Sequence, residues 1–267
     1  MKLFNFIILL FLLFSSCHHQ PDYPSISQTS LSKELIETKA DSGLVILLKD
    51  NEVVAQINLI WEGGVYKEGN AQTFQIKRDM GTLLSPIYWM EALPPISLQD
   101  TVDVGNGIYI NKEGKEIRDH NADRGGYGVI TAEQVIAFDS KVGITKLMER
   151  YGIQPARYSP LEVVEYYNRI AMGDTTLCPG GVMRDIQSVL SKVIAEGTGR
   201  NLYREDLPIA GKTGYSEKNV SACVYLSHGN SIYTCLVIIS NPKGGYPSGG
   251  TMCGDVIKGI INGLSVE

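Results

Sequence analysis

The residues best suited to chemistry in this 267-residue chain are a neighbouring amine and hydroxyl, Lys212 and Thr213, followed by Gly214. Enzymes that transfer an acyl group to a nucleophile use positioned amines and hydroxyls of this kind. Three residues of this kind recur by chance, so the triplet alone is weak evidence. Its position carries more weight, because it follows an amphipathic pattern that ends at residues 196–199 and precedes two β-rich runs. We therefore treat the triplet as a candidate site between a helix and a sheet.

Thiols and imidazoles, the usual metal ligands, are less suitably placed. Beyond Cys17 the chain holds four cysteines, which are Cys178, Cys223, Cys235 and Cys253. None has metal-ligand spacing and the chain has only four histidines, so we expect neither a metal site nor another cofactor. Cys223 and Cys235 lie on two apolar runs that we expect to pair. An exported protein could join them in a disulfide, but we favour buried free thiols.

Apolar periodicity and cap residues predict the elements around these groups. We expect strands at residues 44–48, 53–60, 220–226 and 232–239, a loop at 61–77, and helices at 81–93, from 131, at 143–151, from 159, at 183–196 and at 252–264. Two helix starts are marked strongly, by Thr131 with Gln134 and by Ser159-Pro160 with Glu162. The order of strands, helices, strands and helix indicates one α+β domain whose antiparallel sheet is built from both ends of the chain.

Several longer stretches are distinctive in sequence. Residues 100–107 read D-T-V-D-V-G-N-G, residues 118–121 R-D-H-N, residues 124–130 R-G-G-Y-G-V-I, and residues 166–171 Y-Y-N-R-I-A. Together with the K-T-G triplet, and in order from about residue 44 to the carboxyl end, they resemble the transpeptidase domain of division-type penicillin-binding proteins, in particular its Bacteroides-like lineage. The resemblance implies the penicillin-binding transpeptidase and serine β-lactamase-like fold, an antiparallel sheet flanked by helices. In such enzymes K-T-G accompanies S-x-x-K and S-x-N.

The same resemblance identifies which catalytic motif residues of the family are replaced in this chain. Where members read P-G-S-T-F-K, this chain reads M-G-T-L-L-S, so Thr82 takes the nucleophile slot and Ser85 the lysine slot. Where members read Y-S-S-N-V-G, it reads F-D-S-K-V-G, so Asp139 replaces the motif serine and Lys141 its asparagine. The third motif survives, but Tyr215 follows it where members usually have a small hydroxyl residue.

These replacements remove the family's ordinary chemistry. A serine is a poor nucleophile until a base takes its proton, and the family's lysine is placed to do so. The hydroxyl of Ser85 has no useful basicity near neutral pH, and general acid–base help is typically worth about 10²–10⁴-fold in rate. Thr82 keeps a hydroxyl but adds a methyl group that crowds the attack path. Asp139 also brings a negative charge to the place where a substrate carboxylate would approach Lys212 and Thr213.

Two roles for Lys141 stay open. It could act as a surrogate base for Thr82, or it could join Asp139 and Lys212 in an ion-pair cluster that fills the vacant site. We favour the cluster, because Asp139 and Lys141 differ from the family together and with opposite charge. Lys212 itself is either an inherited site residue, which we favour, or a surface lysine on a strand.

The amino-terminal residues predict export. Lys2 and the apolar run at residues 3–14 are typical of a signal peptide, and the run is too short to span a bilayer comfortably as a helix. Two serines then lead to Cys17, as in a bacterial lipoprotein signal whose cysteine is lipidated after cleavage; an ordinary secretory peptide is the alternative. We expect a signal peptide at residues 1–16, a lipidated tether rich in Ser, Thr, Gln and Pro at 17–41 that could hold a short helix at 32–38, and the transpeptidase-like domain at 42–267.

Only residues 153–158 join two of the predicted helices, where family members have a much longer stretch, so the resemblance implies a truncated helical subdomain and a shallower cleft. A net charge of −5 offers no basic surface for nucleic acid. We predict a membrane-anchored lipoprotein facing the periplasm or the cell surface, a pseudoenzyme that binds peptidoglycan stem peptides or a cell-wall synthesis protein. One alternative is an active D,D-transpeptidase or carboxypeptidase acylated by penicillin through Thr82. The other is a defence or antagonism factor without a ligand in the cleft.

Overall fold

A six-stranded antiparallel sheet forms the centre of the computed structural model, which describes residues 21–216 and 218–264. Its order is β3-β2-β1-β10-β9-β8, so strands from the two ends of the chain meet where β1 pairs with β10. The bounds are β1 Ser42–Lys49, β2 Glu52–Glu62, β3 Val65–Glu68, β8 Ile209–Ser216, β9 Asn219–His228 and β10 Ser231–Ser240. The predicted sheet built from both ends of the chain is confirmed.

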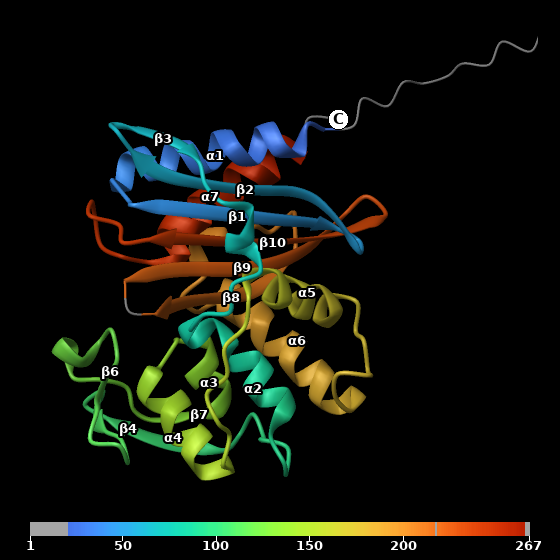
Figure 1. Cartoon of the computed structure of the whole chain (residues 1–267). Helices are drawn as coiled ribbons and strands as arrows, with labels where there is room; N and C mark the ends of the chain where they lie inside the picture. The colour runs from blue at the N-terminus through green and yellow to red at the C-terminus, as the bar shows by residue number, and fades with distance from the viewer. Residues whose placement is uncertain (1–20, 217, 265–267) are drawn as a thin grey trace, which may run out of the picture.

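Both faces of the sheet are covered, which explains why β1 is apolar at every position from Leu44 to Leu48. Val45 and Leu47 belong to one core, and Leu44, Ile46 and Leu48 belong to the core on the other side. Successive side chains of a strand point to opposite faces, so a strand covered twice needs apolar residues at every position. One face is covered by α1 (Tyr23–Thr38) and α7 (Gly254–Leu264). The other is covered mainly by α5 (Pro160–Ala171), as Figure 1 shows.

Helix α1 corrects the expectation of a tether at residues 17–41. From Tyr23 onward these residues belong to the folded domain, since Leu31 and Leu35 are fully buried against the sheet. Asp22 caps the helix by accepting a hydrogen bond from the backbone N–H of Ser25. The polar composition concealed most of the helix, because only a narrow stripe of its residues is apolar. Cys17 and the predicted signal peptide lie outside the described residues.

The remaining helices lie largely beyond the β8 edge of the sheet, below it in Figure 1. They are α2 Ser85–Glu91, α3 Ala132–Ala137, α4 Lys141–Tyr151 and α6 Gly180–Ala195, joined by the short turns η1 Ala71–Phe74, η2 Gly81–Leu84, η3 Ala122–Arg124 and η4 Arg200–Leu202. Two small sheets complete this part, β4 Thr101–Gly105 with β7 Gly128–Thr131 and β5 Ile108–Ile110 with β6 Glu116–Arg118. The predicted capping boxes at Thr131 and Ser159 are both confirmed.

Two strands differ from what apolar patterning predicts. Strand β3 lies within residues 61–77, which were expected to be loop, and it pairs with β2 as an exposed edge strand. Strand β8 contains the K-T-G triplet and two glycines, so it shows little apolar alternation. It is nevertheless almost entirely buried, because it lies between β9 and the helices beyond the sheet edge.

The positions of Cys223 and Cys235 in the sheet exclude a disulfide between them. Cys223 stands opposite Leu236 in the β9–β10 ladder, whereas Cys235 stands opposite Val224. The two cysteines therefore point to opposite faces of the sheet and cannot be joined. All four described cysteines are free and buried, and burial raises the pKa of each thiol. The favoured prediction of buried free thiols is confirmed.

Within the described part of the chain, no helix has both the length and the apolar character needed to cross a bilayer.

Candidate functional site

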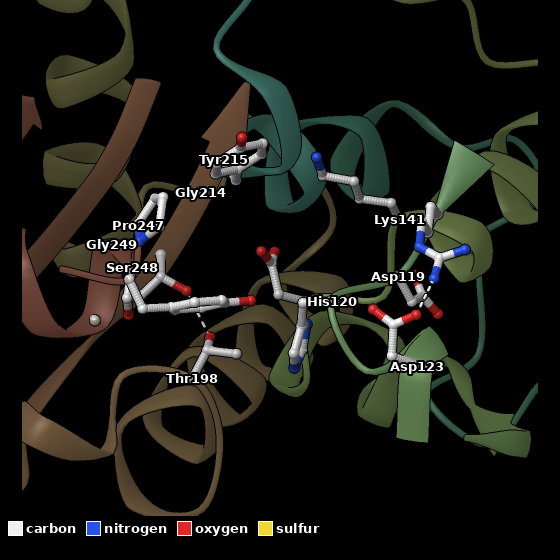
Figure 2. A pocket seen from close by; sticks show the side chains of 15 residues that line it. Asp119, His120, Asp123, Lys141, Thr198, Gly214, Tyr215, Pro247, Ser248 and Gly249 are labelled. Atoms are coloured by element: carbon white, nitrogen blue, oxygen red, sulfur yellow. Dashed lines mark hydrogen bonds and ion pairs between the residues drawn. The ribbon is translucent and has the colours of Figure 1, made fainter. Parts of the chain in front are cut away.

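A pocket of about 620 Å³ opens beside strand β8. Its walls come from the end of β8, the turn between α3 and α4, the segment after β6, and η5 (Gly249–Cys253), the turn that leads into α7. The lining residues are Arg118, Asp119, His120, Asp123, Asp139, Lys141, Thr198, Thr213, Gly214, Tyr215, Tyr246, Pro247, Ser248, Gly249 and Gly250 (Figure 2). The pocket thus brings together the second and third motif positions that the sequence singled out.

Lys212 is held inside the protein and does not project into this pocket. Its side chain is 0% exposed, and its ammonium donates to the carboxylate of Asp139 and, at 2.6 Å, to the carbonyl of Thr213. Burial lowers the pKa of Lys212, and Asp139 opposes that shift. The alternative of a surface strand lysine is therefore wrong, and this half of the expected ion-pair cluster is present.

Asp139 is positioned by the turn between α3 and α4. It adopts a left-handed backbone conformation with φ of 58°, which aspartate tolerates better than most residues. The next residue, Ser140, caps α4, and its hydroxyl donates to Asp119 at 2.8 Å. Asp119 also accepts the backbone N–H of Val142 at 3.0 Å. These bonds fix the turn, so the Asp139 carboxylate is held where the ammonium of Lys212 can reach it.

Lys141 does not join the Asp139–Lys212 pair. Its ammonium lies 4.1 Å from the centroid of the Tyr215 ring, a cation–π contact, and it makes no ion pair with any described residue. Burial is the largest influence on its pKa, which is lowered, while Asp139, Asp79 and Asp119 act in the opposite direction. The three-residue cluster is therefore a pair, with Lys141 separate on the pocket wall.

Thr82 faces β8 rather than the pocket. It is 6% exposed, and its hydroxyl oxygen accepts the backbone N–H of Tyr215 at 3.3 Å. The turn η2 can approach β8 this closely because of two glycines: a Cβ on Gly81 would lie 2.1 Å from the carbonyl of Tyr215, and one on Gly214 would lie 2.7 Å from Leu83 Cβ. The structure places no amine within hydrogen-bonding reach of Thr82 among its described contacts.

Ser85 is in a different place again. Its hydroxyl is buried on α2 without a hydrogen-bond partner among the described residues. It lines a small cavity of about 20 Å³, whose walls are otherwise almost wholly apolar and aromatic side chains from α2, α3 and α4. Neither Thr82 nor Ser85 lines the large pocket, although Thr82 contacts Tyr215, the residue directly after the third motif.

Several pocket residues were not identified as candidates from the sequence. The hydroxyl of Thr213 pairs with that of Thr198, which lies just after α6. His120 contacts the phenol of Tyr127 at 3.0 Å. The pKa of Tyr127 is raised to about 12, mainly because the phenol is buried. The adjacent glycines at 249–250 were a sequence signal for a close approach of two backbone segments at this pocket. A Cβ on Gly250 would lie 2.0 Å from the carbonyl of Thr198, so the two walls meet through backbone.

No group of three or more histidine, cysteine, aspartate or glutamate side chains arranged to hold a metal ion occurs among residues 21–216 and 218–264. The chemistry that the pocket offers is hydrogen bonding by hydroxyls and backbone, one ammonium on the wall, and aromatic surface from Tyr215 and Tyr246.

Comparison with solved structures identifies the fold. The chain superposes on a peptidoglycan glycosyltransferase from Burkholderia ambifaria with a TM-score of 0.70 and 18% identity, covering 91% of this chain and 96% of that one. It superposes on the transpeptidase domain of Burkholderia pseudomallei penicillin-binding protein 3 with a TM-score of 0.67 and 16% identity, covering 93% and 98%. The predicted fold, an antiparallel sheet flanked by helices as in penicillin-binding transpeptidase domains, is confirmed.

Sequence comparison adds a partial relative. Stage V sporulation protein D of Bacillus subtilis (strain 168) is 31% identical in a 90-residue alignment that covers 29% of this chain and 14% of that protein. No family model matches the chain. The resemblance to penicillin-binding proteins thus holds at the level of the fold.

Proposed function

We propose that this chain is an exported lipoprotein whose penicillin-binding transpeptidase-like domain does not catalyse acyl transfer and instead binds peptidoglycan peptides. The observation that carries the proposal is that Thr82, Ser85 and Lys212 do not line the pocket. Thr82 hydrogen-bonds to the backbone of β8, Ser85 faces an apolar cavity, and Lys212 is fully buried against Asp139.

The loss of catalysis follows from what a nucleophile needs. A hydroxyl becomes reactive when a base within about 2.6–3.2 Å can take its proton. Thr82 has no such base among its described hydrogen-bond partners: its oxygen accepts the N–H of Tyr215 at 3.3 Å, and the hydroxyl in the lysine slot has no basicity to offer. Lys141, the surrogate base considered from the sequence, contacts the face of the Tyr215 ring. The backbone N–H of the same Tyr215 donates to the Thr82 hydroxyl.

A binding role is supported by the pocket that remains. Its volume of about 620 Å³ is in the range of sites that hold small ligands. Hydroxyls of Thr198, Thr213 and Ser248 and the ring of Tyr246 line it, which suits a peptide with polar backbone and short side chains. The solved structures that share the fold include a penicillin-binding protein domain and a peptidoglycan glycosyltransferase, which favours a cell-wall ligand over an unrelated one.

The site of action is part of the proposal. An apolar run at residues 3–14 that leads to Cys17 supports export and lipid anchoring. The described part of the chain begins close behind that cysteine with α1, so an anchor there would hold the domain near the membrane surface.

Labelling with a fluorescent penicillin tests the catalytic half of the proposal. We expect no covalent adduct on the purified protein under conditions that label a penicillin-binding enzyme completely. An adduct that disappears in Thr82→Ala would establish the alternative, an active enzyme acylated at Thr82.

Co-sedimentation with purified peptidoglycan tests the binding half. We expect the protein to sediment with the polymer, and Tyr246→Ala to reduce the bound fraction several-fold, because Tyr246 lines the pocket and is 72% exposed. Tyr203→Ala is the matched control, since Tyr203 is 53% exposed and lies outside the pocket. Equal sedimentation of the two variants and the parent would contradict binding through this pocket.

A further inference from the structure

The charged groups of the pocket are almost all paired with one another. Asp123 pairs with Arg118, and Asp139 pairs with Lys212. Asp119 accepts hydrogen bonds from the start of α4. Among the described residues, each carboxylate that lines the pocket therefore has a donor.

Lys141 is the exception on the cationic side. It lines the pocket, and its ammonium has the Tyr215 ring as its contact and no carboxylate in ion-pair range among the described residues. Figure 2 shows its side chain extending from one wall toward Tyr215, across the open part of the pocket. A half-buried ammonium on an aromatic face is only partly compensated for the water that it has lost, so an anion beside it would be stabilising.

The third motif cannot supply that anion site. Lys212 is fully buried, with donors committed to Asp139 and to the carbonyl of Thr213. The hydroxyl of Thr213 is engaged with that of Thr198. An incoming carboxylate at this end of the pocket would also meet Asp139, whose charge opposes it.

We propose that Lys141 binds the carboxyl-terminal carboxylate of the peptide ligand, so that anion recognition in this chain lies at the start of α4 instead of at the K-T-G triplet. The inference rests on the proposed function, because it assumes that the pocket takes a peptide. The Asp139–Lys212 pair has a different role, because it neutralises the ammonium of Lys212 inside the protein and leaves Lys141 as the ammonium that lines the pocket. Burial lowers the pKa of Lys141 against the opposing effect of Asp139, Asp79 and Asp119, and a bound carboxylate would act in the same direction as these three.

Calorimetric titration of the purified protein with two synthetic peptides tests the assignment. One peptide ends in D-alanyl-D-alanine with a free carboxylate, and the other is identical except for a carboxyl-terminal amide. We expect the parent protein to bind the acid about 10- to 100-fold more tightly than the amide, as a charge-assisted hydrogen bond would require. Lys141→Gln should bind both peptides with the affinity of the amide, whereas Lys141→Arg should retain most of the preference.

Lys112→Gln is the matched control. It removes the same charge from an exposed lysine of the neighbouring β5–β6 segment that does not line the pocket, so it should leave the preference unchanged. Thermal melting of each variant checks that the domain remains folded, and the Arg variant keeps the test valid if the Gln variant is unstable.

The failures are distinguishable. Equal binding of acid and amide by the parent protein, or a preference that persists in Lys141→Gln, would overturn the role of Lys141 and leave peptide binding intact. Failure of both peptides to bind the parent protein would overturn the assignment of Lys141 together with the proposed peptide-binding function.

Discussion

The pocket beside β8 and the α1–α7 layer on one face of the sheet each hold a largely buried carboxylate, and they do so in opposite ways. Asp139 in the pocket is paired with the ammonium of Lys212. Glu34 on α1 is 7% exposed, and its main electrostatic neighbours are Asp255 and Glu37, with Lys33 acting the other way. In the pocket the buried charge is compensated by an ion pair with Lys212, whereas in the α1–α7 layer the carboxyl of Glu34 takes up a proton more readily.

The pKa values express this difference. Burial, followed by Asp255 and Glu37, raises the pKa of Glu34 to about 7. In the pocket, the carboxylate of Asp139 is instead paired with the buried ammonium of Lys212. A buried acid beside a cation is therefore a fixed structural element, whereas a buried acid beside other acids responds to pH.

Breaking the pocket pair should have the largest effect. Asp139→Asn keeps the shape of the side chain and tolerates the left-handed backbone, but it leaves the ammonium of Lys212 buried without a counterion. We expect the free energy of unfolding to fall by about 3–5 kcal/mol, measured by urea denaturation. The double variant Asp139→Asn, Lys212→Met should recover part of the loss, because both charges are then gone.

Asp123→Asn is the control for that variant. Its pair with Arg118 is exposed, with side-chain exposures of 84% and 42%, so the loss should stay below about 1 kcal/mol. A loss of the same small size in Asp139→Asn would show that the pocket pair does not hold a buried charge.

The α1–α7 layer should give an intermediate effect that depends on pH. The folded pKa of Glu34 is about 7, above its ordinary value of 4.5, so the folded state binds the proton more tightly than the unfolded state. Stability from this group is complete below pH 4.5 and is lost as the pH rises to about 7. We expect a fall of about 1–3 kcal/mol across that window.

Glu34→Gln should flatten this part of the stability profile, because the neutral amide cannot titrate. Glu68→Gln is the matched control, since Glu68 is exposed on β3 and is not among the groups that shift the pKa of Glu34. Denaturation curves collected between pH 4 and 8 supply the measurement. A slope that persists unchanged in Glu34→Gln would place the titrating group elsewhere.

The same two regions show what the sequence could and could not predict. The pocket was largely predicted, because its motif positions are close to one another in the fold and carry distinctive residue types. The separation of Lys141 from the Asp139–Lys212 pair was not, since it depends on the direction of side chains across a turn and on the ring of Tyr215. The length of α1 and its packing on the sheet were missed, beyond a short helix at residues 32–38, because its buried stripe is narrow and its exposed residues are those of a tether.

The burial of Thr82 and Ser85 depends on contacts that no local pattern reports. Gly81 and Gly214 let η2 and β8 approach each other, and only the folded chain shows that these two glycines face across the same gap. A motif position assigned by resemblance specifies where a residue lies in the sequence. The direction in which its side chain points is decided by packing against elements far away in sequence.

The smallest predicted effect compares two buried hydroxyls. Ser27 on α1 and Ser85 on α2 each have a buried oxygen without a hydrogen-bond partner in the described structure. Each hydroxyl has therefore lost water without gaining a partner, so Ser27→Ala and Ser85→Ala should each leave stability unchanged or raise it by up to about 1 kcal/mol in urea denaturation. Thr38→Ala is the contrast, because its hydroxyl donates to the carbonyl of Glu34 at 2.7 Å, and its removal should cost about 1 kcal/mol. If Ser85→Ala instead lost stability as Thr38→Ala does, the hydroxyl in the lysine slot would have a bonding partner, and the separation of the first motif from the pocket would have to be reconsidered.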